Sequence, residues 1–267
     1  RLSNDLRPTL FLAQPSNLLA GNISIVHKVT GSSRTFMGEE GAGISAVRTA
    51  FARVQSGQSD VVLVGGAFNG EREDMLLLFE LGHYLTKDKL LPVWSREGHT
   101  AGFAQGSIGA FLVLESAEHA KKRGAKAYAQ LDHVVGEHGR RNAGAGRARL
   151  NDAWNRMPSL DLDGVMSGAT GAAPCTSTEA SWLHDGLPDL PVRAFGSIFG
   201  HGVEALFPLG IALAALAVNK GEMPPPFEEA ERAASKSATS VLVTGMGHHR
   251  AEGLGVVTKI EDEGSTR

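Results

Sequence analysis

The sequence predicts a layered α/β protein, and three segments carry this prediction. Residues 44–55 (ISAVRTAFARVQ) place apolar side chains at helical spacing, with Gly57 in position to end the helix. Residues 60–67 (DVVLVGGA) form a continuous apolar run of strand length directly afterwards. Residues 109–115 (GAFLVLE) repeat this pattern ahead of another short helix. Helices followed by buried strands are typical of α/β folds.

The other elements are expected in chain order from turn residues and apolar spacing. They are a short helix or strand at 22–29, a helix-rich segment at 71–85, a polar loop at 87–100, a helix at 116–123, a strand at 127–135, a mobile loop at 139–149, a short helix at 153–157, a strand at 164–167, a helix at 178–184, a strand at 192–195, an apolar helix at 203–219 and strands at 240–244 and 255–260.

Composition narrows the class of protein. The chain has 267 residues, is 42% hydrophobic and carries a formal net charge of -3, so it can bury a large core and offers no basic field for nucleic acid. Cys175 is the only cysteine, which excludes an internal disulfide and favours the reducing cytoplasm. The apolar run at 205–218 is too short to span a bilayer and is expected as a buried helix. Because the chain begins at Arg1 rather than Met, we interpret it as a fragment.

No cofactor or metal is expected from the motifs. The glycine patterns GAG at 41–43 and GATG at 168–171 do not follow the strand, G-x-G-x-x-G and helix order of a dinucleotide site. His248 and His249 have no carboxylate neighbours at ligand spacing, so they are weak evidence for a metal site.

Several segments, taken in order, resemble a known family. They are NLLAGNISI at 17–25, DVVLVGGA at 60–67, GFAQGSIGAFLVLESAEHAKKRGAKAYAQL at 102–131, GHGVEA at 200–205 and TGMG at 244–247. Together they resemble a β-ketoacyl-acyl-carrier-protein synthase, a condensing enzyme of the thiolase fold. The resemblance implies a thiolase-like α/β/α/β/α fold whose N-terminal part is missing from this chain. Residues 1–115 would then be the remainder of the N-terminal half and residues 116–267 the C-terminal half.

The resemblance also implies where catalytic groups should lie. The family uses a cysteine nucleophile at a buried helix N-terminus and two histidines that stabilise the carbanion and oxyanion. Glu40 is at the cysteine position. The first histidine position falls on Ala169, or on Pro174 in another register, and the second on Phe195 or Ser197. All three catalytic side chains are therefore expected to be replaced.

Further residues are interpreted against simpler alternatives. Glu40 is a residual acid or base or a polar plug in the nucleophile position, or else it is a helix N-terminal charge or the partner of an arginine across a dimer interface. Cys175 is expected to be structural, and His201 is either a displaced catalytic histidine or a packing residue at a glycine turn. Met246 takes the family's gate position, and with Phe195 it is expected to line an acyl pocket. Four arginines contact an acidic carrier protein or belong to a solvated loop: Arg140, Arg141, Arg147 and Arg149.

The sequence thus predicts a catalytically silent, ketosynthase-like subunit of fatty-acid or related acyl-chain synthesis. It would bind an acyl carrier protein, form a homodimer or a heterodimer with an active ketosynthase, and have no membrane span. Two alternatives remain: an active synthase or decarboxylase that uses Glu40 or His201, and a homodimer with a purely structural role.

Overall fold

In the computed structural model, residues 17–87, 89–140 and 142–260 are described. They fall into two units, residues 1–38 and residues 39–267. The first unit contains one helix within the described residues, α3 (Leu18–His27). The residue after it, Lys28, has a left-handed φ of 54° and ends the helix. The sequence left a helix or a strand open for this segment, and the structure has a helix.

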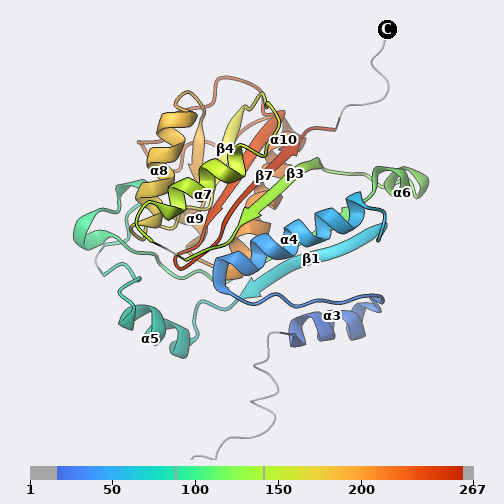
Figure 1. Cartoon of the computed structure of the whole chain (residues 1–267), viewed down its shortest axis with the longest axis horizontal. Coiled ribbons are helices and arrows are strands. Elements are labelled where there is room, and N and C mark those ends of the chain that lie inside the picture. Colours follow the sequence, from blue (N-terminus) through green and yellow to red (C-terminus); the bar gives the residue numbers. More distant parts are fainter. Residues whose placement is uncertain (1–16, 88, 141, 261–267) are drawn as a thin grey trace, which may run out of the picture. The chain divides into compact units, whose positions relative to one another are not determined.

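The second unit alternates helices with strands (Figure 1). The helices are α4 (Glu39–Gln55), α5 (Glu73–Leu81), α6 (Ala117–Lys122), α7 (Ala145–Trp154), α8 (Cys175–Gly186), α9 (Gly196–Phe199) and α10 (Leu206–Lys220). The strands are β1 (Val61–Phe68), β2 (Ile108–Glu115), β3 (Gln130–Glu137), β4 (Gly164–Ser167), β5 (Val192–Ala194), β6 (Ser240–Met246) and β7 (Glu252–Thr258), with short 3-10 turns at Val93–Ser95, Gly98–Thr100 and Val203–Ala205.

The strands form two sheets. The larger has the order β3-β7-β6-β4-β5, in which β4 runs parallel to both β5 and β6 while β7 is antiparallel to β6 and β3. The smaller is the antiparallel pair of β1 and β2. Helices α7 and α8 pack on one face of the large sheet, while α4 and α10 lie between its other face and the small sheet (Figure 1). This gives the layer order α/β/α/β, four successive layers of the predicted order.

Alternation along β6 explains how one strand serves two cores. Val241 and Val243 face the core formed with α4 and α10, whereas Leu242 between them faces the core beneath α7 and α8. All three side chains are fully buried. Successive side chains of a strand point to opposite faces, so a strand covered on both sides becomes continuously apolar.

The apolar helix predicted at 203–219 is present as the turn at Val203–Ala205 followed by α10. By length and composition alone, Val203–Lys220 would be long enough to cross a membrane, but 56% of it is buried inside the protein. It packs against both sheets and α4, so we assign it to the core.

Two expectations about local structure were wrong. Residues 139–149 were expected to be a mobile loop, yet α7 begins at Ala145, because Leu150 and Ala153 supply a fully buried face. Residues 60–67 were expected to be a buried strand, but Val61 and Leu63 of β1 are 43% and 38% exposed. They share this exposed face with Phe111 and Val113 of β2.

Candidate functional site

Glu40 lies in the first turn of α4, and its side chain is buried, with 7% exposed. The unpaired N–H groups and dipole of a helix N-terminus favour a negative charge there. The preceding residue, Glu39, has a φ of 52°, which is uncommon for any residue with a side chain. Strained backbone of this kind often accompanies functional sites.

His201 reaches Glu40 from the loop ahead of the Val203–Ala205 turn. Its backbone is fixed on both sides, since its N–H donates to the Ala104 carbonyl (2.7 Å) and its carbonyl accepts from the Gly106 N–H (3.0 Å). The Phe103 ring packs on the imidazole with 4.2 Å between ring centroids. His201 is 1% exposed, so the loop holds this ring in one buried position.

His248 comes from the turn between β6 and β7. The ring is buried, and its Nε2 lies 3.2 Å from Thr170 Oγ1. Gly247 makes this approach possible, because a Cβ there would lie 2.2 Å from the Arg250 carbonyl oxygen and 3.1 Å from Glu40 Oε2. The turn therefore needs glycine at position 247 to place the His248 imidazole beside the Glu40 carboxylate.

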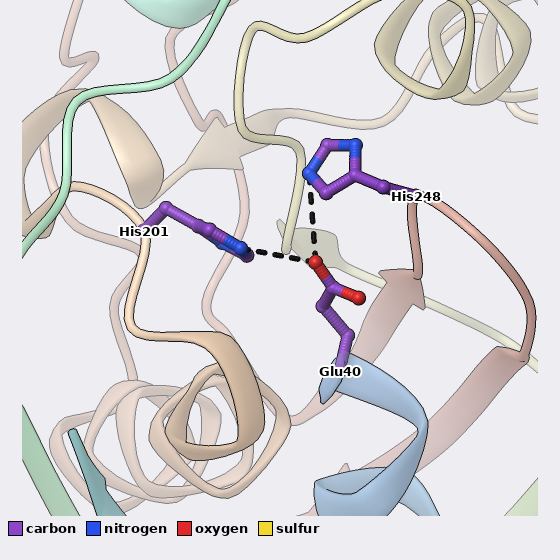
Figure 2. A group of neighbouring side chains, drawn as sticks. All are labelled: Glu40, His201 and His248. Atoms are coloured by element: carbon purple, nitrogen blue, oxygen red, sulfur yellow. Dashed lines mark ion pairs between the residues drawn. The ribbon is translucent and has the colours of Figure 1, made fainter. Parts of the chain in front are cut away.

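The three side chains converge on one carboxylate oxygen (Figure 2). Glu40 Oε1 is 3.0 Å from His201 Nε2 and 3.5 Å from His248 Nε2. Glu40 Oε2 points away from both rings and is buried without a hydrogen-bond partner among the described residues. The His201 N–H is not aligned for a hydrogen bond, so its contact with Glu40 is mainly electrostatic.

Electrostatics keep Glu40 ionised. Burial alone would raise the pKa of this carboxyl, but the charge of His248 and the close His201 more than offset it and lower the pKa from 4.5 to about 2. Nearby Glu204 behaves differently, since its burial raises its pKa and Glu40 adds repulsion. One firmly ionised carboxylate thus sits between two imidazoles.

The space beside Glu40 is small. Glu40, Gly168, Thr244 and Met246 help to line a cavity of about 10 Å³, enough for about one water molecule. The remaining lining comes from Ile44, Leu206, Phe207 and Gly245. The cavity can hold a water near Glu40, but it has no volume for an acyl chain.

These groups limit the chemistry that the site can perform. A carboxylate with a pKa of about 2 is a weak base at neutral pH, because a general base works best with a pKa near the operating pH. The two imidazoles could donate to a developing oxyanion or act as acid and base, oriented by Glu40 as a carboxylate orients histidine in hydrolase triads.

The structure brings His201, rather than Ala169 or Ser197, to Glu40. Ala169 packs against Val93 in a small apolar cluster. The hydroxyl of Ser197 accepts a hydrogen bond from the Val93 N–H at 2.8 Å. That Ala169 and Ser197 match the family's histidine positions stays a prediction, but His201 is the histidine that meets Glu40. Within the described residues the charged partners of Glu40 are two histidines, and the alternative of an arginine across a dimer interface stays a prediction.

The other predicted pocket residues lie close by. Met246 lines the cavity beside Glu40. Phe195 is fully buried, and its ring packs against Gly168 and Gly210. Cys175 is buried in the apolar cluster beneath α7 and α8, and its thiol donates to the Gly247 carbonyl at 3.4 Å. This supports the structural interpretation of Cys175.

The arginines of the predicted carrier-binding loop separate into two groups. Arg149 forms a buried ion pair with Glu252 at 2.5 Å, whereas Arg147 pairs with Asp185 at 2.7 Å on the surface, so both guanidinium groups already have a partner within the chain. Arg140 lines an open depression of about 640 Å³. Its other lining residues are Glu39, His138, Gly139, His249 and Arg250. Arg141 lies outside the described residues.

Sequence reasoning missed the roles of His248 and Thr170. His248 was set aside because no carboxylate lies near it in sequence, yet Glu40 is its partner across the fold. The signal that could have found the site was available in two glycine turns: GHGVEA contains His201, and His248 directly follows TGMG. The glycines of the GAG pattern have a packing role, since a Cβ on Gly43 would lie 2.1 Å from the Glu204 carbonyl oxygen.

Comparison with known proteins shows which proteins this chain is related to. Residues 3–120 match the family model of the N-terminal domain of β-ketoacyl synthases. The beta subunit of the tetracenomycin polyketide synthase ketoacyl synthase from Streptomyces glaucescens is 29% identical over 219 residues, which cover 77% of this chain and 53% of that protein. The chain spans about half the length of the curated relatives it matches.

Solved structures of the same fold cover almost the whole chain. The ishigamide ketosynthase/chain length factor has a TM-score of 0.80 and 21% identity, and the match covers 96% of this chain and 68% of that one. A type II polyketide ketosynthase in complex with its acyl-carrier protein has a TM-score of 0.81 and 17% identity over 96% of this chain and 70% of that one. These matches confirm the predicted thiolase-like ketosynthase fold.

Proposed function

The chain is a relative of the β-ketoacyl synthases, and from this premise we propose that it is a non-condensing partner subunit of an active ketosynthase. Its relatives named above take part in polyketide synthesis, so we propose polyketide rather than fatty-acid assembly. The proposed location is the cytoplasm, where the reduced Cys175 is stable.

The observation that supports this proposal most directly is the ionised Glu40 at the N-terminus of α4. Condensation needs a nucleophile that holds the acyl group as a thioester, and a carboxylate cannot form one. The same negative charge opposes the oxyanion that would develop at the helix N-terminus and repels the carboxylate of a malonyl group. The cavity of about 10 Å³ beside Glu40 supports the same conclusion, because a malonyl or acyl thioester does not fit in it.

A partner subunit is supported by the exposed apolar face of the small sheet. Val61 and Leu63 of β1 lie beside Phe111 and Val113 of β2, and all four are 38% to 61% exposed. Contiguous exposed apolar surface often marks an interface. We propose that an active ketosynthase covers this face.

The depression beside the site supports contact with a carrier protein. Its lining includes the basic residues Arg140 and Arg250 together with His249. Glu39 is the one acidic residue among the described residues of the lining and lies 3.6 Å from Arg250. An acidic carrier protein would be attracted by the two guanidinium groups. We expect Arg140→Glu with Arg250→Glu to weaken carrier binding at least about tenfold at low salt, and Lys259→Glu to serve as a matched charge control.

The experiment compares the chain alone, an active ketosynthase alone and the two together, each with malonyl-loaded and acyl-loaded carrier protein. We expect no carbon dioxide and no condensed product from the chain alone, and a change in product length or yield when both are present. Turnover by the chain alone would overturn the proposal.

A second candidate function is malonyl decarboxylation without condensation. It is favoured by one observation, that His201 and His248 flank Glu40 where they could stabilise an enolate. If this function is correct, the chain alone releases carbon dioxide from malonyl carrier, and His201→Phe abolishes the release while His249→Phe does not. Absence of release from the parent protein rules it out.

A further inference from the structure

The cluster around Glu40 combines one carboxylate and two imidazoles from distant parts of the chain. Glu40 lies on α4, His201 on the loop before the Val203–Ala205 turn, and His248 on the turn between β6 and β7. All three are buried, and one ligand-type atom from each lies within 4.8 Å of the other two. An ion bound between these three groups would balance their charge and satisfy their hydrogen-bonding capacity.

The distances are near those of a metal centre. Imidazole nitrogens and carboxylate oxygens bind Zn²⁺ at about 2.0–2.2 Å, so neighbouring ligand atoms of a tetrahedral ion lie about 3.3–3.6 Å apart. Glu40 Oε1 is 3.0 Å from His201 Nε2 and 3.5 Å from His248 Nε2. The two imidazole nitrogens lie within 4.8 Å of each other, so a shift of the rings toward each other would place all three ligand atoms around one ion.

The hydrogen bonding of the cluster is incomplete in a way that a cation would satisfy. Glu40 Oε2 and His201 Nε2 are buried, and neither has a hydrogen-bond partner among the described residues. His201 Nε2 is nevertheless aimed at the Glu40 carboxylate (Figure 2). A buried polar atom left without a partner costs stability, and an ion bound by His201 Nε2 and Glu40 Oε1 would remove that cost at the imidazole.

The surroundings also suit a metal ion. Glu40 brings a buried negative charge into the cluster and Glu204 is close enough to interact with it, so a divalent cation would compensate this negative charge. Phe103 packs on both rings, with centroid distances of 4.2 Å to His201 and 5.2 Å to His248, which keeps bulk water away. Thr170 Oγ1, 3.2 Å from His248 Nε2, is a further oxygen at the edge of the cluster.

We propose that Glu40, His201 and His248 bind one divalent transition-metal ion of the Zn²⁺ class. Two histidines and one glutamate form an established zinc ligand set, and such a set leaves a further coordination position for water. This inference does not depend on the proposed partner function, because a metal would fill the site whether or not the chain acts with a ketosynthase.

The test uses the full chain stripped with a chelator and then titrated with Co²⁺ and Zn²⁺. We expect one ion per chain, visible d–d absorption for Co²⁺ and its displacement by Zn²⁺. Glu40→Gln and His201→Phe should each weaken binding at least about 100-fold, whereas His249→Ala, on the neighbouring residue, should leave it unchanged.

A stability readout guards against variants that fail to fold. Zn²⁺ should raise the urea midpoint of the parent chain and of His249→Ala, but not that of Glu40→Gln, provided that circular dichroism shows Glu40→Gln to be folded. Failure of the parent chain to take up one ion, or binding that survives both Glu40→Gln and His201→Phe, would overturn the proposal. Activity of the chain plays no part in either readout, so this failure is distinct from failure of the proposed function.

Discussion

Replacing Glu40 by glutamine should remove a pH-dependent part of the stability of the chain. The folded pKa of Glu40 is lowered from 4.5 to about 2, so its contribution to stability is fully present above about pH 5 and is lost as the pH falls toward 2. At about 1.4 kcal/mol per pKa unit, the contribution at pH 7 is about 3 kcal/mol. It should fall to about 2 kcal/mol at pH 3.5, because part of the unfolded-state carboxylate is then protonated.

The assay is urea unfolding of the parent chain and of Glu40→Gln at several pH values, with chelator present. We expect the parent to be more stable by about 3 kcal/mol at pH 7, and the difference to shrink on acidification. Glu39→Gln is the matched control, since Glu39 is 38% exposed and its distance to Arg250 is 3.6 Å; we expect it to cost about 0.5 kcal/mol or less. A difference between the parent and Glu40→Gln that is small, or that does not vary with pH, would refute the reasoning.

Three other changes test the fold around the site. Arg149→Met should cost about 3 kcal/mol by removing the arginine that pairs with the buried Glu252, and adding Glu252→Gln should recover part of this in urea unfolding; a cost near zero would contradict the pairing. Gly43→Ala should cost about 1–3 kcal/mol, because its Cβ would lie 2.1 Å from the Glu204 carbonyl oxygen, and an unchanged midpoint would show that the contact is looser than described. Backbone amides around Leu150 in α7 should exchange slowly with deuterium. Exchange as fast as in a loop would show that this segment is mobile, as the sequence predicted.

Periodic segments could be predicted well from the sequence. The apolar spacing of Ile44, Val47 and Phe51 predicted α4, and the continuous run before Pro224 predicted α10. Both have a strong local signal, since one face of each helix is packed against a sheet. The start of α4 was five residues earlier than the apolar pattern, because Glu39 and Glu40 extend the helix where charge stabilises its end.

Features that depend on distant partners could not be predicted. α7 looked like a loop because Gly, Ala and Arg dominate it, and only its contacts with β7 and α8 show that Leu150 is a core residue. Arg149 and Glu252 are separated by 103 residues, so their ion pair left no local pattern. The candidate site could not be predicted for the same reason. Glu40 and His201 were both candidates from the sequence, but no residue near His248 in the sequence indicated that its ring contacts a carboxylate.

The most direct measurement is the intact mass of the protein after incubation with acyl-loaded carrier protein. We predict no acyl adduct on the parent chain, because the carboxylate of Glu40 cannot hold an acyl group as a thioester and Cys175, the first residue of α8, is buried. Glu40→Cys should also stay unmodified, because the cavity of about 10 Å³ beside residue 40 has no room for an acyl group. An acyl adduct on the parent chain that is lost in Glu40→Gln would contradict the central claim that this site does not hold acyl groups.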